Sequence, residues 1–141
     1  MRGQSITGGG RESMSSLVRW SRLATVATAW LFAAAVVVQV FLAGASIFDP
    51  ANPRWTDHRT VGEMIGTLTI FLVIFAVVGR LPLLQIGMAV AIFFLYGFQW
   101  MFANLDNGSV AALHAVNALA LFWLSVELGK RAMVVHRGMG R

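Results

Sequence analysis

Four long apolar runs dominate the sequence, and each is about the twenty residues that an α-helix needs to cross a bilayer. The runs are Leu23–Gly44, Val61–Gly79, Leu83–Ala103 and Val110–Leu128. None of them shows the alternation of apolar and polar residues that membrane barrel strands require. Unpaired backbone groups are costly in hydrocarbon, so we expect the four runs to be helices. The sequence therefore predicts an all-α membrane protein.

The composition supports this class. Of the 141 residues, 57% are hydrophobic and 12% are charged, whereas soluble domains are about 45–50% apolar and about 25% charged. The length allows one domain. The chain has no cysteine, which excludes disulfides, thiolate metal sites and covalently attached c-type heme.

Lysine and arginine are distributed unequally between the two sides of the predicted spans. Only Arg54 and Arg59 lie on one side, and the other nine of the eleven basic residues lie on the opposite side. The nine are Arg2, Arg11, Arg19, Arg22, Arg80, Lys130, Arg131, Arg137 and Arg141. By the positive-inside rule both termini are cytoplasmic, and the short connections predict an antiparallel four-transmembrane-helix bundle in the cell inner (plasma) membrane.

The same distribution accounts for the net charge of +5. Basic side chains beside helix ends fix the topology and contact anionic lipid headgroups. We therefore expect the lipid bilayer as a partner and no nucleic acid.

The chain divides into three segments by composition. Residues 1–18, rich in Gly, Ser and Arg, are predicted to be a disordered basic tail. Residues 19–130 form the transmembrane domain, and residues 131–141 form a basic cytoplasmic tail. The first apolar run exceeds the 7–15 residues of a signal peptide core, so we interpret it as a retained helix. Ser109 is a candidate N-cap of the fourth helix.

Ionisable groups near a membrane span need a functional or structural reason. His58, at the outer start of the second run, shares one helix stripe with Gly62 and Gly66 because the three are four residues apart. His114 shares a face of the fourth run with Asn117. Two imidazoles on helices of the same direction could supply both axial ligands of a heme, with the glycines making room for the ring.

Each of these residues also has a simpler interpretation. The glycines match a small-xxx-small packing motif, and Asn117 is a candidate for hydrogen bonding between helices. His58 could lie in the headgroup region, and His114 could bond a carbonyl of a neighbouring helix. Glu63 is either the partner of Thr60 in a capping box or a proton-handling carboxylate.

Other side chains would complete a heme site. Arg59 could pair with a propionate, and Asp57 could orient an imidazole. We expect a hydrophobic pocket wall from side chains of the third run, namely Met88, Phe93, Phe94 and Phe98. His136 is expected to be solvated in the basic tail.

Two segments carry a resemblance to a known family. Residues 57–66 resemble the His-Arg-x-x-Gly start of the second helix in each half of the heme A synthase family, and residues 113–120 are similar to the Val-His-x-x-x-Ala start of its fourth helix. In each of its two fused bundles, one histidine from each of these helices faces a heme. The resemblance thus implies heme ligation by His58 and His114.

Over residues 20–132 the chain as a whole looks most like an uncharacterised family of small bacterial four-helix membrane proteins, a resemblance that implies no activity. It departs from the synthases in having one bundle, no cysteine pair and no counterpart of the catalytic glutamate. We therefore expect no independent catalytic activity.

Three functions remain as hypotheses. The first is a protein that binds heme b (cytochrome b-like) for electron transfer or heme handling, in contact with a respiratory or other membrane complex. The second is a cofactor-free structural or accessory subunit of a larger membrane complex. The third is a small transporter that uses Glu63.

Overall fold

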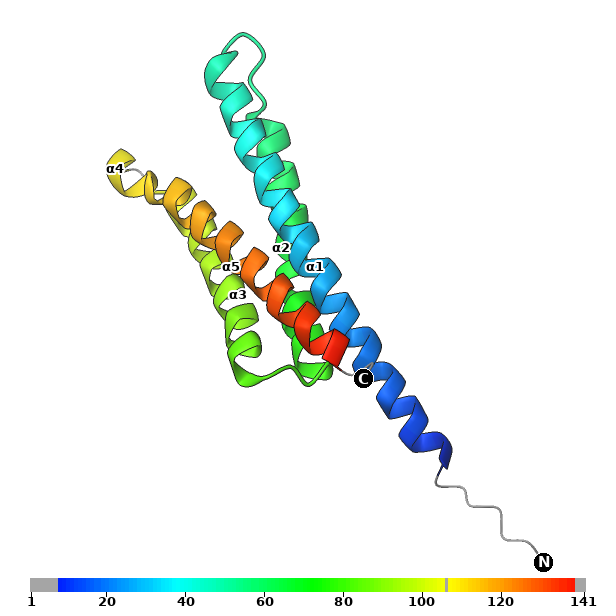
Figure 1. Ribbon diagram of the computed structural model, residues 1–141. Coiled ribbons are helices and arrows are strands. Elements are labelled where there is room, and N and C mark those ends of the chain that lie inside the picture. The colour runs from blue at the N-terminus through cyan, green and yellow to red at the C-terminus, as the bar shows by residue number, and fades with distance from the viewer. Residues whose placement is uncertain (1–7, 106, 139–141) are drawn as a thin grey trace, which may run out of the picture.

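The computed structural model describes residues 8–105 and 107–138, and this part of the chain is helical apart from short connections (Figure 1). The helices are α1 (Gly8–Phe48), α2 (Trp55–Val78), α3 (Leu83–Ala103), α4 (Gly108–Ala111) and α5 (Leu113–Arg137). Four stretches are long and apolar enough to cross a membrane: Met14–Phe48, Trp55–Val78, Leu83–Ala103 and Gly108–Arg137. The prediction of four apolar spanning helices is thus confirmed, and the chain is a multi-pass membrane protein by the length and composition of its helices.

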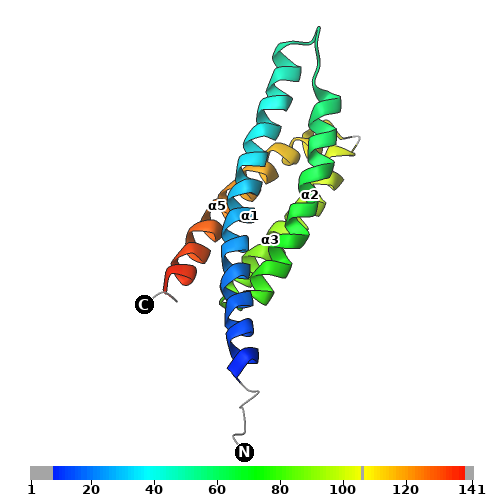
Figure 2. The ribbon, with the colours of Figure 1, turned by 90° about the vertical axis from the view of Figure 1, so that its right-hand side faces the viewer.

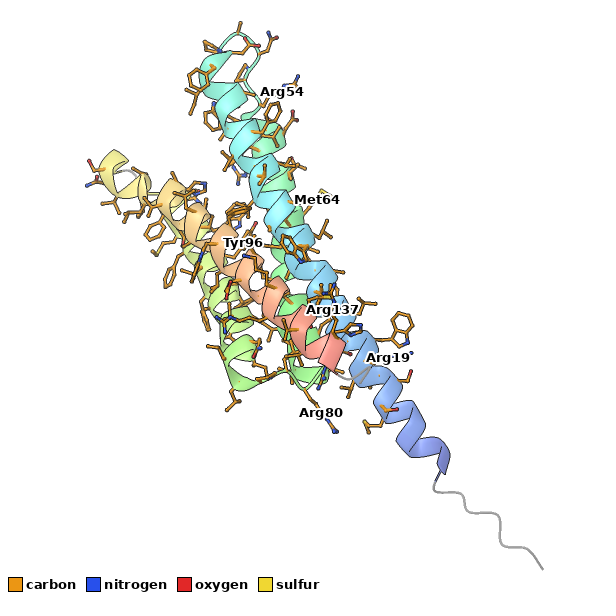
Figure 3. All side chains as sticks on the ribbon, in the orientation of Figure 1. Arg19, Arg54, Met64, Arg80, Tyr96 and Arg137 are labelled. Atoms are coloured by element: carbon orange, nitrogen blue, oxygen red, sulfur yellow. The ribbon has the colours of Figure 1, made fainter. Side chains whose placement is uncertain are left out.

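The four long helices contact one another in a ring. Helix α1 packs against α2 and α5, and α3 packs against the same two helices. Figures 1 and 2 show the start of α1, the end of α5 and the α2–α3 connection at one end of the molecule. We name this the Arg80 end, and the opposite end, which holds the α1–α2 and α3–α4 connections, the Arg54 end. Figure 3 shows Arg19 and Arg137 toward the Arg80 end.

The side chain of Arg22 holds the Arg80 end together. Its Nε donates to the backbone oxygen of Gly79 over 2.7 Å. Its two other nitrogens donate to the backbone oxygens of Val135 and Arg80, each over 3.5 Å. One guanidinium on α1 thereby satisfies carbonyls at the end of α2 and near the end of α5, where helical carbonyls lack partners within their own helix.

The α2–α3 connection ends α2 with a Schellman motif. The N–H of Leu81 bonds the oxygen of Ala76 over 3.1 Å, and the N–H of Arg80 bonds that of Val77 over 2.9 Å. This geometry needs a left-handed residue, and Arg80 supplies it with a φ of 48°. Pro82 follows directly and starts α3 as its N-cap.

The buried apolar core fills only the part of the bundle nearer the Arg80 end. Spacings of three and four residues place it on one face of each long helix. Its members are Val26, Ala29, Phe32, Ala33 and Val36 of α1, Leu72 and Ala76 of α2, Leu81 of the α2–α3 connection, Met88, Ala89 and Ile92 of α3, and Leu121, Leu128 and Ala132 of α5. Among the described residues, no buried apolar side chain lies nearer the Arg54 end than Val36, Leu72, Ile92 and Leu121. Toward that end the α1–α2 pair diverges from the α3–α5 pair (Figure 1).

Several helix boundaries differ from the prediction. Helix α3 has the predicted bounds, but α1 begins at Gly8 and α5 continues to Arg137. Residues 8–18, which we expected in a disordered tail, belong to α1. Residues 131–137, which we expected in a tail after the transmembrane domain, belong to α5. A nucleated helix extends at little cost through polar residues, and hydropathy reveals only the apolar part. The other residues of the predicted tails, 1–7 and 139–141, lie outside the described part.

Two predicted helix starts are wrong. Helix α2 begins at Trp55, five positions before Thr60, so Thr60 is inside the helix and cannot form the capping box with Glu63. At α4 the N-cap is Asn107, whose side-chain oxygen accepts the N–H groups of Ser109 and Val110. Ser109 therefore lies within the first turn rather than at the cap.

Candidate cofactor site

The two predicted ligand histidines come together. His58 lies in the first turn of α2 and His114 in the first turn of α5. Their ring centres are 6.1 Å apart and their planes are inclined by 56°. Both side chains are half-buried, toward the Arg54 end, where the apolar core is absent.

Each imidazole is held by a backbone carbonyl of a neighbouring long helix. The Nδ1 of His58 lies 3.1 Å from the oxygen of Gln39 on α1, and the Nδ1 of His114 lies 3.0 Å from the oxygen of Gln99 on α3. A carbonyl oxygen can only accept, so in both bonds Nδ1 carries the proton. In a neutral imidazole with its proton on Nδ1, the Nε2 atom has the lone pair through which a histidine binds a metal.

The distance between the two ring centres is comparable with that of two imidazoles bound to one metal ion. A bond from a transition metal to an imidazole nitrogen is about 2 Å, and that nitrogen is about 1 Å from the ring centre, so two coaxial ligands place their ring centres about 6 Å apart. The observed 6.1 Å meets this value. No cluster of three or more His, Cys, Asp or Glu side chains suited to a bare metal ion occurs in the described part of the chain.

Polar side chains of α3 and α5 surround His114. The Nε2 of Gln99 donates to the backbone oxygen of His114 over 3.0 Å, so residues 99 and 114 bond each other reciprocally. The Nδ2 of Asn117 donates to the Oε1 of Gln99 over 2.5 Å and to the oxygen of Leu95 over 2.8 Å. Asn117 and Gln99 thus bind the two helices together, as interhelical amides in membranes do.

The space beside Gly62 and Gly66, which we expected a heme ring to use, is occupied by side chains of Tyr96 on α3 and Gln39 on α1, and sequence reasoning missed Tyr96. A Cβ on Gly66 would lie 2.6 Å from Cε1 of Tyr96, and a Cβ on Gly62 would lie 3.0 Å from Nε2 of Gln39. The Tyr96 hydroxyl donates to the oxygen of Gly62, and its ring packs edge-on against Phe32 of the core with 6.0 Å between centres. Tyr96 therefore lies between the apolar core and the histidine pair. As the single tyrosine of the chain, placed in an apolar run, it offered a signal: its hydroxyl needs a partner there.

The charged residues beside His58 point elsewhere. Arg59 pairs with Glu63 over 3.3 Å, and both side chains are more than half exposed. We expected Asp57 to orient the His58 ring, but Asp57 pairs with Arg54 over 3.3 Å. The His58 ring is bonded by the Gln39 carbonyl instead. The structure does not bring Arg59 to the histidine pair.

Helix α3 places its aromatic residues differently from our expectation. Met88 is buried in the core, but Phe93, Phe94 and Phe98 are exposed on the outside of the bundle. Phe93 lines a shallow apolar groove with Ile70, Val73, Ile74 and Val90. His136 also differs, because it is half-buried at the Arg80 end with its Nδ1 shielded from solvent and without a partner.

The chain is similar to known proteins over one segment. Residues 39–105, slightly less than half of the chain, match a family of unknown function (DUF6220). The match begins at Gln39 and includes His58, Tyr96 and Gln99, and it ends before His114. No curated protein and no solved structure matches the chain.

Proposed function

We propose that this protein binds heme b in the membrane, with His58 and His114 as the axial ligands, for electron transfer or heme handling. The observation that carries this proposal is the matched pair of Nδ1 bonds to Gln39 and Gln99, which leaves both Nε2 atoms available on rings whose centres are 6.1 Å apart. One-electron transfer is the chemistry that heme supplies when it is held in this way.

The packing of the bundle supports the same proposal. The buried apolar core ends at Val36, Leu72, Ile92 and Leu121. Toward the Arg54 end the two helix pairs diverge (Figure 1), and the bond from the Tyr96 hydroxyl to the Gly62 oxygen links α3 to α2 there. Helices in lipid associate through close packing, and in this half no buried apolar side chain of the described residues supplies such packing. Tyr96, bonded to Gly62 and packed against Phe32, lies on the core side of the histidine pair.

We further propose the membrane orientation. The basic residues gather at the Arg80 end, where Figure 3 shows Arg19, Arg80 and Arg137. In an antiparallel bundle with both termini cytoplasmic, the histidine pair lies in the outer half of the cell inner membrane. The likeness to one half of a heme A synthase belongs to the same proposal, since it assigns the same two ligands.

The experiment is heme extraction from the full chain purified in detergent from heme-supplied cells. We expect about one heme b per chain in the wild type and none in the double variant His58→Ala/His114→Ala. His136→Ala is the matched control because it removes the third histidine from the opposite end, and it should retain the heme. A wild type without heme, or a double variant with full occupancy, contradicts the proposal.

The second candidate is a cofactor-free accessory subunit of a larger membrane complex. The exposed Phe93, Phe94 and Phe98 on α3 favour it, since they form an aromatic surface that a partner helix could cover. Its test is purification under mild detergent. Colourless protein that elutes in fixed stoichiometry with another complex supports this candidate over heme binding.

A further inference from the structure

We propose that the two histidines are unequal ligands: His114 holds the cofactor permanently, and His58 is replaceable by a small neutral ligand such as carbon monoxide. This inference depends on the proposed function. It adds a second binding position, on the α2 side of the site.

The ring of His114 has one hydrogen bond, and further bonds fix the backbone of α5 around it to α3. Its Nδ1 donates to the Gln99 oxygen, and Gln99 returns a bond from Nε2 to the His114 oxygen. Asn117, which is buried, donates to Gln99 and to the oxygen of Leu95. Any displacement of His114 relative to α3 has to lengthen several of these bonds together.

The ring of His58 also has one hydrogen bond, but no amide side chain of the described residues bonds the backbone of His58. Its hydrogen bond goes to the Gln39 oxygen over 3.1 Å. The Gln39 side chain gives no return bond to His58, and its Oε1 is buried without a partner. On its other side His58 meets the ring of Trp55, edge-on with 6.0 Å between centres, and Trp55 is half exposed.

Helix capping does not distinguish the two histidines. Each lies in the first turn of a helix whose N-cap makes no side-chain capping bond, Arg54 for α2 and Ala112 for α5. The start of α2 is tied to α1 by the bond from the Arg54 N–H to the Ser46 hydroxyl over 2.6 Å. The difference lies in the amide side chains: Gln99 bonds the backbone of His114, whereas the Gln39 side chain makes no bond to His58. Displacement of His114 therefore breaks more bonds to the neighbouring helix than displacement of His58 does.

The test compares His58→Gly with His114→Gly in the full chain, with heme content and the carbon monoxide difference spectrum of the reduced protein as readouts. We expect His58→Gly to keep at least half of the wild-type heme and to bind carbon monoxide stoichiometrically, and added imidazole to restore the wild-type spectrum. We expect His114→Gly to lose at least nine-tenths of the heme. Equal retention or equal loss in the two variants overturns the inference while the heme proposal stands, whereas a wild type without heme overturns the proposed function itself.

Two glutamines of α3 provide a matched test of the bonds around His114. Gln99→Leu removes the side chain that bonds His114 and Asn117 but keeps the carbonyl that accepts from Nδ1, whereas Gln85→Leu removes a buried glutamine near the Arg80 end. We expect Gln99→Leu to lower heme content about fivefold and to shift the α band of the reduced protein, and Gln85→Leu to change neither. If the His58 and His114 variants differ in heme content but Gln99→Leu keeps the wild-type heme content and α band, the proposed role of Gln99 in holding His114 is overturned.

Discussion

The imidazole rings of His58 and His114 lie 6.1 Å apart between centres, although they belong to helices α2 and α5, which are separated in the chain by α3 and α4. A backbone carbonyl of α1 orients the His58 ring, and a backbone carbonyl of α3 orients the His114 ring. All four long helices therefore contribute to the pair, and its geometry depends on how they pack.

The contact between Tyr96 and the glycine stripe should contribute to stability. Gly66→Ala places a methyl group 2.6 Å from the Tyr96 ring, and overpacking of this kind costs about 1–3 kcal/mol. Gly87→Ala is the control, since nothing lies within 4 Å of its Cβ position. Thermal unfolding in detergent should show a lower midpoint for the first variant and an unchanged or higher one for the second. If the penalty of Gly66→Ala persists in a Tyr96→Ala background, the clash is not its cause.

Arg22 should stabilise the Arg80 end. Arg22→Gln removes the guanidinium that bonds Gly79, Arg80 and Val135, and unpaired carbonyls together with lost charged hydrogen bonds cost about 1.5–3 kcal/mol. Arg19→Gln removes the same charge from an exposed position of the same helix, so the effects on topology are matched. Reversible unfolding should separate the two variants by at least about 1 kcal/mol. Equal free energies of unfolding for Arg22→Gln and Arg19→Gln would show that the three bonds of Arg22 do not contribute to stability.

Arg80 is a site for a stabilising substitution. Its φ of 48° is a left-handed conformation that costs a non-glycine residue about 1 kcal/mol. Arg80→Gly should relieve this cost and raise the unfolding midpoint, while Arg80→Ala, which removes the same charge and keeps a Cβ, should not. A gain of equal size in both variants would indicate that charge and not backbone conformation is responsible.

The proposed orientation can be tested without background labelling because the chain has no cysteine. Ala51→Cys lies in the exposed α1–α2 connection and Gly138→Cys follows α5. A membrane-impermeant maleimide applied to intact cells from which any outer membrane has been removed should label the first variant and not the second. Labelling of the second in intact cells would reverse the orientation.

Sequence patterns predict some parts of this molecule well. The apolar runs gave four spans, with the bounds of α3 as observed, because the cost of unpaired backbone in lipid leaves only one regular structure for such runs. The spacing of His58 and His114 within their helices placed both at one end of the bundle, since each is near the start of a span that runs in the same direction.

Other parts depend on packing that a single sequence does not show. Which face of α3 is buried could not be read from its nearly uniform hydropathy, so Phe93, Phe94 and Phe98 were placed inside when they lie outside. The partner of the glycine stripe, Tyr96, is on another helix, and its position follows from the relative rotation of α2 and α3. The expected bond of His114 to a carbonyl of a neighbouring helix is confirmed, but the particular carbonyl that bonds each histidine depends on packing, because every residue has one.

The central claim is most directly tested by the reduced-minus-oxidised absorption spectrum of membranes that overproduce the full chain. We predict a Soret and an α-band difference typical of heme b, in proportion to the amount of the chain and absent when both His58 and His114 are replaced by alanine. An unchanged difference spectrum in that double variant, or no difference in the wild type, would contradict the account.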